Sequence, residues 1–182
     1  MSRAIGMAEF KTVSAGMTAA DAMVKTADVD IIVAETVCPG KYIVIITGEL
    51  SAVNASVEAA KTMHSMHLID SFVLGNPADE IFPAIYGASK VEIVNSLGII
   101  ETYDAAAIIV AADQAAKTAE VSLIEIRLAR GMCGKSYLLI TGEVAAVEAA
   151  ISRAQKAVEP RGMFLDSSVI ARPDKKLIDQ IL

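Results

Sequence analysis

The sequence predicts an α+β protein built from two tandem domains, each with a ferredoxin-like, split-βαβ order of elements. The chain repeats itself, so that Gly6 recurs as Gly98, 92 residues later, and Pro77 recurs as Pro173, 96 residues later. Each copy reads β-α-β-β-α-β with a short closing helix, an order that predicts an antiparallel sheet with helices on one face. We place the two domains at residues 1–92 and 93–182.

The duplication is supported by matches that keep their order along both halves. Ala4–Glu9 returns as Ser96–Glu101, and Gly40-Lys41 returns as Gly134-Lys135 with two residues added in the preceding turn. Further matched pairs are Asp21 with Asp113, Lys25 with Lys117, Thr47 with Thr141, and Asp70 with Asp166. Chance does not preserve the order of so many matches, so the domains are homologous.

The first helix of each copy is expected to begin after a capping side chain, Ser14 in one copy and Asp104 in the other. It should run through Ala22-Met23 and through Ala115-Ala116 respectively. Nearly continuous apolar runs, such as Tyr137–Ile140, are typical of central strands that helices cover.

The second helix of each copy carries an apolar stripe at helical spacing, which predicts one buried face. The stripe consists of Val53, Val57, Ala60 and His64 in the first copy, and of Val147, Ile151, Ala154 and Val158 in the second. Glu49 and Glu143 are expected in the first turn of this helix, where a carboxylate is favourable to the helix dipole.

Composition narrows the classes of protein further. The chain is 54% hydrophobic with mean hydropathy +0.50 and no Trp, so we expect additional apolar burial between subunits. Net charge −6 argues against nucleic-acid binding. Two cysteines give no disulfide framework, which is typical of proteins in a reducing compartment. The apolar run Ala105–Ala112 is too short to span a bilayer, and residues 1–6 lack a signal-peptide core, so we expect a cytosolic protein without a membrane partner.

The stretch Thr36–Lys41 is the strongest candidate for chemistry. Pro39 fixes φ and Gly40 permits positive φ, so the chain can reverse tightly just past Cys38 and point its thiol outward. One thiol cannot hold a metal cluster, and the simplest interpretation is a free thiol that behaves as a small hydrophobe. Cys133 aligns with Pro39 and is expected to be an ordinary packed thiol, with a supporting role near a pore as the alternative.

Two other patterns are weaker candidates for a functional site than the stretch Thr36–Lys41. Ala129 and Gly134-Lys135-Ser136 resemble a P-loop, but Ala129 replaces its first glycine and a β-type run follows where a helix is needed. His64 and His67 have a spacing suitable for metal, yet no acidic or cysteine cluster accompanies them. No catalytic triad or carboxylate pair stands out, and we do not expect an enzyme.

The aligned repeats resemble bacterial microcompartment shell proteins with two tandem, unpermuted shell domains. The resemblance rests on Asp21–Ala27, on Gly-Glu at the strand–helix junctions, and on Val169–Pro173, and it covers essentially the whole chain. It implies a homotrimer whose six domains form a pseudo-hexameric tile that meets other shell proteins edge to edge. The pore loops would hold Val37, Pro39, Gly40, Met132, Cys133 and Gly134, and the tile edges Lys25, Lys117 and Arg172. Asn76 replaces Arg172 in the first copy, so alternate edges are expected to differ.

Within this family the stretch Thr36–Lys41 is similar to tandem-domain proteins of propanediol-utilisation compartments that bind an iron–sulfur cluster. The resemblance implies one 4Fe-4S cluster per trimer, held by Cys38 of all three chains at the three-fold pore, with a non-cysteine or external fourth ligand. The protein would then move electrons or clusters across the shell, with a luminal redox enzyme as a further partner.

Two alternatives remain at this point. One is a shell tile whose open pore conducts small polar metabolites, with Cys38 incidental to that role. The other is a free-standing ferredoxin-like trimer that binds a small effector. Spectroscopy of Cys38 separates the first alternative from the cluster hypothesis, and Lys25→Ala separates the second, because only a tile should lose its assembly.

Overall fold

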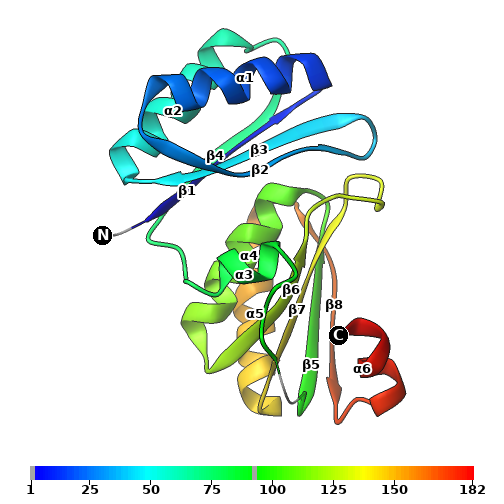
Figure 1. The fold of residues 1–182 in the computed structure, drawn as a ribbon. Helices are drawn as coiled ribbons and strands as arrows, with labels where there is room; N and C mark the ends of the chain where they lie inside the picture. Colours follow the sequence, from blue (N-terminus) through cyan, green and yellow to red (C-terminus); the bar gives the residue numbers. More distant parts are fainter. Residues whose placement is uncertain (1–2, 92–93) are drawn as a thin grey trace. The chain divides into compact units, whose positions relative to one another are not determined.

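A computed structural model describes residues 3–91 and 94–182 of the chain (Figure 1). It divides into two compact units, residues 1–77 and 78–182. The predicted boundary at residues 92 and 93 lies outside the described residues, and the division falls earlier because helix α3 (Ile81–Ile85) packs on the second unit. Among the described residues, no helix is long and apolar enough to cross a membrane.

The first unit is the predicted βαββαβ arrangement. Its elements are β1 (Ala4–Phe10), α1 (Val13–Thr26), β2 (Val29–Val37), β3 (Lys41–Gly48), α2 (Leu50–Met63) and β4 (Leu68–Gly75). The strands form one antiparallel sheet in the order β2-β3-β1-β4, with both helices on the same face (Figure 1). The fold therefore has β1, the first strand in the chain, at a central position.

The second unit repeats this topology. After α3 it contains β5 (Ser96–Thr102), α4 (Ala105–Thr118), β6 (Val121–Arg127), β7 (Ser136–Gly142), α5 (Val144–Val158), a 3-10 turn (Glu159–Arg161), β8 (Phe164–Ala171) and α6 (Lys175–Ile181). The sheet order β6-β7-β5-β8 matches the first unit. Even the register irregularities recur, after Ile31 and after its equivalent Leu123, which confirms the duplication at the level of the backbone.

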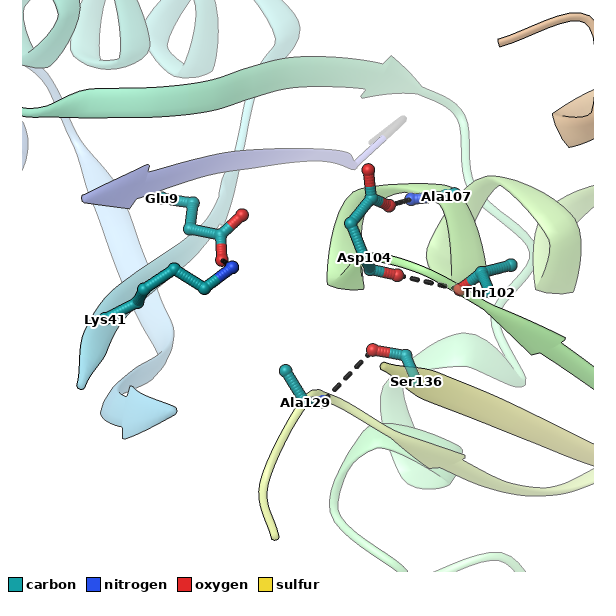
Figure 2. A network of polar contacts seen from close by, with 7 residues as sticks. All are labelled: Glu9, Lys41, Thr102, Asp104, Ala107, Ala129 and Ser136. Carbon is teal, nitrogen blue, oxygen red and sulfur yellow. Dashed lines mark hydrogen bonds and ion pairs between the residues drawn. The ribbon is translucent and has the colours of Figure 1, made fainter. Parts of the chain in front are cut away.

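The capping predictions are half right. Asp104 caps α4, and its Oδ1 accepts a hydrogen bond from the Ala107 backbone N–H at 2.6 Å (Figure 2). In the first copy the cap is Thr12 and not Ser14, because α1 already begins at Val13. Glu49 and Glu143 sit one residue before α2 and α5, at the N-cap, and make no side-chain capping bond.

The predicted apolar stripes are buried against the sheets, except that His64 ends α2 as its C-cap and is only partly buried. Close contact between each second helix and its central strand depends on a glycine. A Cβ on Gly98 would lie 2.6 Å from Val147 Cγ1 and 2.7 Å from Ile140 Cγ1, and Gly6 in β1 is similarly close to Val53. The duplicated glycines thus set the distance between helix and sheet.

Helix α6 departs from the prediction that helices cover one face. Alternation along β5 directs Gly98 towards α5, so its neighbours Leu97 and Ile99 face the other way. Ile178 and Ile181 of α6 pack against Leu97 on that opposite face, beside β5 and β8 (Figure 1). The sequence pattern did not indicate which face α6 covers, because this helix has only seven residues.

Candidate functional site

The candidate site is the tight turn between β2 and β3. Strand β2 ends at buried Val37, β3 begins at Lys41, and the Gly40 N–H donates to the Val37 carbonyl at 2.9 Å. Gly40 has φ 84°, as its predicted role requires, and the Cys38–Pro39 peptide bond is cis. Cys38 is partly exposed at this turn, so its thiol is within reach of ligands outside the chain.

A buried ion pair fixes the base of this turn. Lys41 Nζ pairs with the carboxylate of Glu9 on β1, and the Glu9 side chain is only 1% exposed (Figure 2). Burial strengthens this pair and makes either charge costly without the other. The recurrence of Lys41 and Glu9 as Lys135 and Glu101 marks both positions in the sequence, although it does not show that the two side chains pair.

The equivalent turn of the second unit is longer and is held differently. The Ala129 N–H donates to the buried Ser136 Oγ at 3.0 Å (Figure 2). The Lys135 N–H donates to the Met132 carbonyl at 3.1 Å. Cys133 is exposed with φ 53° and directly precedes Gly134, just as Pro39 precedes Gly40. Strand β7 begins at Ser136, so no helix N-terminus is present for a P-loop.

The described residues of one chain hold no complete metal site. Among residues 3–91 and 94–182, no three His, Cys, Asp or Glu side chains lie close enough to hold a metal ion. Cys38 nevertheless fits the role of one ligand, because thiolates are the usual ligands of iron–sulfur clusters and this thiol lies on an exposed turn. The remaining ligands would have to come from other chains.

The predicted edge residues Lys25 and Lys117 occupy equivalent positions in the two units, but their acidic partners differ in burial. Lys25 pairs with Asp21 at 2.6 Å on exposed surface, whereas Lys117 pairs at 2.7 Å with a buried Asp113. Asn76 and Arg172 both adopt left-handed φ, 53° and 51°. The backbone N–H of each donates to a residue before the first strand, to Arg3 and Asn95 respectively, at 3.1 Å, so the two positions are true equivalents.

One polar cluster was not predicted from the sequence. Tyr137 donates its hydroxyl to Glu125 Oε2 at 2.7 Å, and the Arg127 guanidinium binds the same carboxylate and lies 5.7 Å from the Tyr137 ring centre. Burial, together with the Glu125 hydrogen bond and charge, raises the pKa of Tyr137 to about 12. The comparison of the two copies gives no signal for this cluster, because the equivalent positions of the first copy are Val33, Glu35 and Ile43.

The histidines make no metal site in the described part of the chain. The His64 and His67 rings pack edge to face with centroids 6.5 Å apart, and Phe10 contacts His64 in the same manner. Their arrangement is that of an aromatic cluster at the end of α2.

Two βαββαβ units, duplicated in sequence and backbone, with a cysteine on a β2–β3 turn, define a tandem-domain α+β protein. The BMC domain model matches residues 4–77 and 96–173, one match in each unit. The chain therefore belongs to the BMC-domain family of bacterial microcompartment shell proteins, and this places it in a compartment shell.

Individual relatives agree with this assignment. The bacterial microcompartment shell protein PduT of Citrobacter freundii is 36% identical over 182 residues, which covers 100% of this chain and 99% of the relative. A crystal structure of a microcompartment protein from Desulfitobacterium hafniense superimposes with TM-score 0.94 at 44% identity, covering 98% of this chain and 99% of that one. The carboxysome shell protein CcmK2 of Synechocystis is 34% identical over 85 residues, 44% of this chain and 82% of its own length.

Proposed function

We propose that this shell protein assembles as a trimeric tile and that three Cys38 thiolates, one from each chain, bind one iron–sulfur cluster at the shared axis. The observation that carries the proposal is the position of Cys38: a partly exposed thiol on a tight turn, with a buried ion pair at the turn's base. A cluster ligand needs such a place, because its sulfur must reach the metal while its backbone stays fixed.

Symmetry supplies what the single chain lacks. Three chains around one axis bring three thiolates together, whereas a 4Fe-4S cluster needs four ligands, normally all cysteine. The fourth position would be left to a non-cysteine or external ligand. When bound, such a cluster supplies one-electron transfer or a transferable iron–sulfur unit at the shell. Neighbouring shell tiles would contact the edges that carry Lys25, Lys117 and Arg172.

The experiment is anaerobic purification of wild type, Cys38→Ser and Cys133→Ser, each reconstituted with iron and sulfide. We expect a brown wild type with broad absorption near about 400 nm, an EPR signal on reduction, and roughly four irons per trimer. Cys38→Ser should lose all of these, while Cys133→Ser, the matched control in the equivalent turn, should keep its iron. A wild-type trimer that stays colourless would leave the tile with an open pore for small polar metabolites and would refute the cluster.

A further inference from the structure

The segment that follows the first copy is held by contacts within the chain. After Pro77, the Ala78 N–H donates to Asp113 Oδ1 on α4 at 3.0 Å. Helix α3 then packs on α4 and β6, and its Ile81 is fully buried. All of these residues belong to the second unit, so the segment after copy 1 is docked on copy 2.

The segment that follows the second copy is the sequence equivalent of this docked segment. Asp174 corresponds to Ala78 and Leu177 to Ile81, each 96 residues later. The domain matches cover two copies, and within the described residues this segment packs on its own sheet instead of on a following copy. Accordingly, no residue of α6 is buried, and Leu177 is 42% exposed where Ile81 is 0%.

The equivalent docking surface on the first copy is correspondingly exposed. Asp113, which accepts the Ala78 bond, is 2% exposed, whereas its counterpart Asp21 on α1 is 59% exposed. Leu123 on β6 is 2% exposed, whereas its counterpart Ile31 on β2 is 43% exposed. The hydrogen-bond acceptor and the apolar side chain that are buried in the second copy therefore both have exposed counterparts in the first copy.

The contact of α6 with its own sheet is partial. A surface hollow of about 430 Å³ opens beside it, lined by Leu97, Ile99, Tyr137, Leu139, Leu177 and Ile181 among others. Ile178 and Ile181 pack on this sheet, but no residue of α6 is buried, so the apolar area that the contact removes from water is limited.

We propose that α6 of one chain docks on α1 and β2 of a second copy of the chain. The Asp174 backbone N–H donates to Asp21 of that copy, and Leu177 covers its Ile31. The contact is head-to-tail, so it closes into a ring when the rotation between chains permits. The inference rests on the trimer of the proposed function and names the contact that closes it.

Disulfide trapping tests the contact directly, in a background in which Cys38 and Cys133 are both Ser. The test variant carries Asp21→Cys and Asp174→Cys, and the matched control carries Ala78→Cys and Asp113→Cys. Under mild oxidation the control should close within one chain and keep the monomer mass. The test variant should give thiol-reversible species of two and three chains on a non-reducing gel, and neither single-cysteine variant should pass two chains.

Light scattering on the unoxidised protein separates this inference from the proposed function. If light scattering gives a trimer but the test variant does not cross-link, the α6 contact is overturned and the trimer of the proposed function remains. A monomer at micromolar concentration overturns both. Since Asp174 also caps α6, a second measurement avoids that residue. Leu177→Asp should weaken trimer association at least about tenfold, while Leu182→Asp, at another exposed leucine of the same segment, should not. Equal association of the two variants would overturn the contact.

Discussion

At the scale of single residues, the pair Lys41–Glu9 joins the start of β3 to β1 beside the Cys38 turn. The Glu9 carboxylate is almost completely buried, and in the structure Lys41 neutralises it at the first residue of β3, next to the Cys38 turn. Losing one partner of a buried pair costs far more than losing an exposed pair, because the remaining charge stays out of water. The turn should therefore depend on this pair for its position.

We expect Lys41→Met to lower the free energy of unfolding by roughly 3 kcal/mol, since Glu9 would be left buried and unpaired. Urea unfolding at one fixed protein concentration measures this. The control is Lys61→Met, which breaks the exposed pair with Glu58 and should cost under about 0.5 kcal/mol. Equal losses in the two variants would mean that Glu9 is neutralised in another way.

Tyr137 predicts a dependence on alkaline pH. Its pKa is raised to about 12 by burial first and then by Glu125, so the folded state holds the phenol proton more tightly than the unfolded chain does. This stabilisation is complete below the unfolded pKa of about 10 and is lost as pH rises through about 12. Tyrosinate absorbance should show one late-titrating group that Tyr137→Phe removes. Glu125→Gln should shift that group to lower pH, and an unchanged titration would contradict the assignment.

At the scale of elements, the repeat and the apolar periodicity were sufficient to predict the order of strands and helices. Both signals are local, and each copy checks the other: Val53 and Val147 mark the same buried stripe. What failed depends on one position or on distant contacts. Thr12 and Ser14 are both good capping residues, and sequence alone does not fix where α1 begins. The placement of α3 on the second unit is set by tertiary contacts that periodicity does not contain.

The candidate site was predicted to a similar extent. The residue types at Cys38, Pro39 and Gly40 indicated an exposed reversing turn, and the structure has that turn. The ion pair of Lys41 with Glu9 was missed because it joins neighbouring strands, whose register the sequence does not give.

The close approach of α5 to β5 yields a prediction about the element pair. Gly98→Ala would place a methyl group 2.6 Å from Val147 Cγ1, so we expect a loss of about 1–3 kcal/mol in unfolding free energy. Val147→Ala in the same chain should recover part of that loss by making room for the new methyl group. If the two changes simply add in urea unfolding, the helix does not rest on Gly98.

At the scale of the whole molecule, duplication allows the two halves of a tile to diverge. Fusion places two different copies in one chain, and each can then carry its own turn and edge. Cys38 lies in a short turn of the first unit and has no counterpart at its own position in the second, where the turn is longer. The predicted edge positions differ in the same way, with Asn76 in one copy and Arg172 in the other.

Arg172 gives the sharpest test of the tile edge, because its conformation argues against a purely structural role. Its φ is 51°, a region in which Asn is several-fold enriched over most residues, and the first copy has Asn76 there at φ 53°. The backbone conformation at this position is unfavourable for Arg. A contact of the Arg172 side chain outside its own domain would explain why Arg stands there. We expect Arg172→Asn to leave the unfolding free energy within about 0.5 kcal/mol of wild type, or slightly above it, while abolishing sheets of tiles in electron microscopy. The reciprocal Asn76→Arg should fold normally and should not impair the sheets. If Arg172→Asn instead unfolds the domain, or leaves sheet formation intact, Arg172 does not act at the edge.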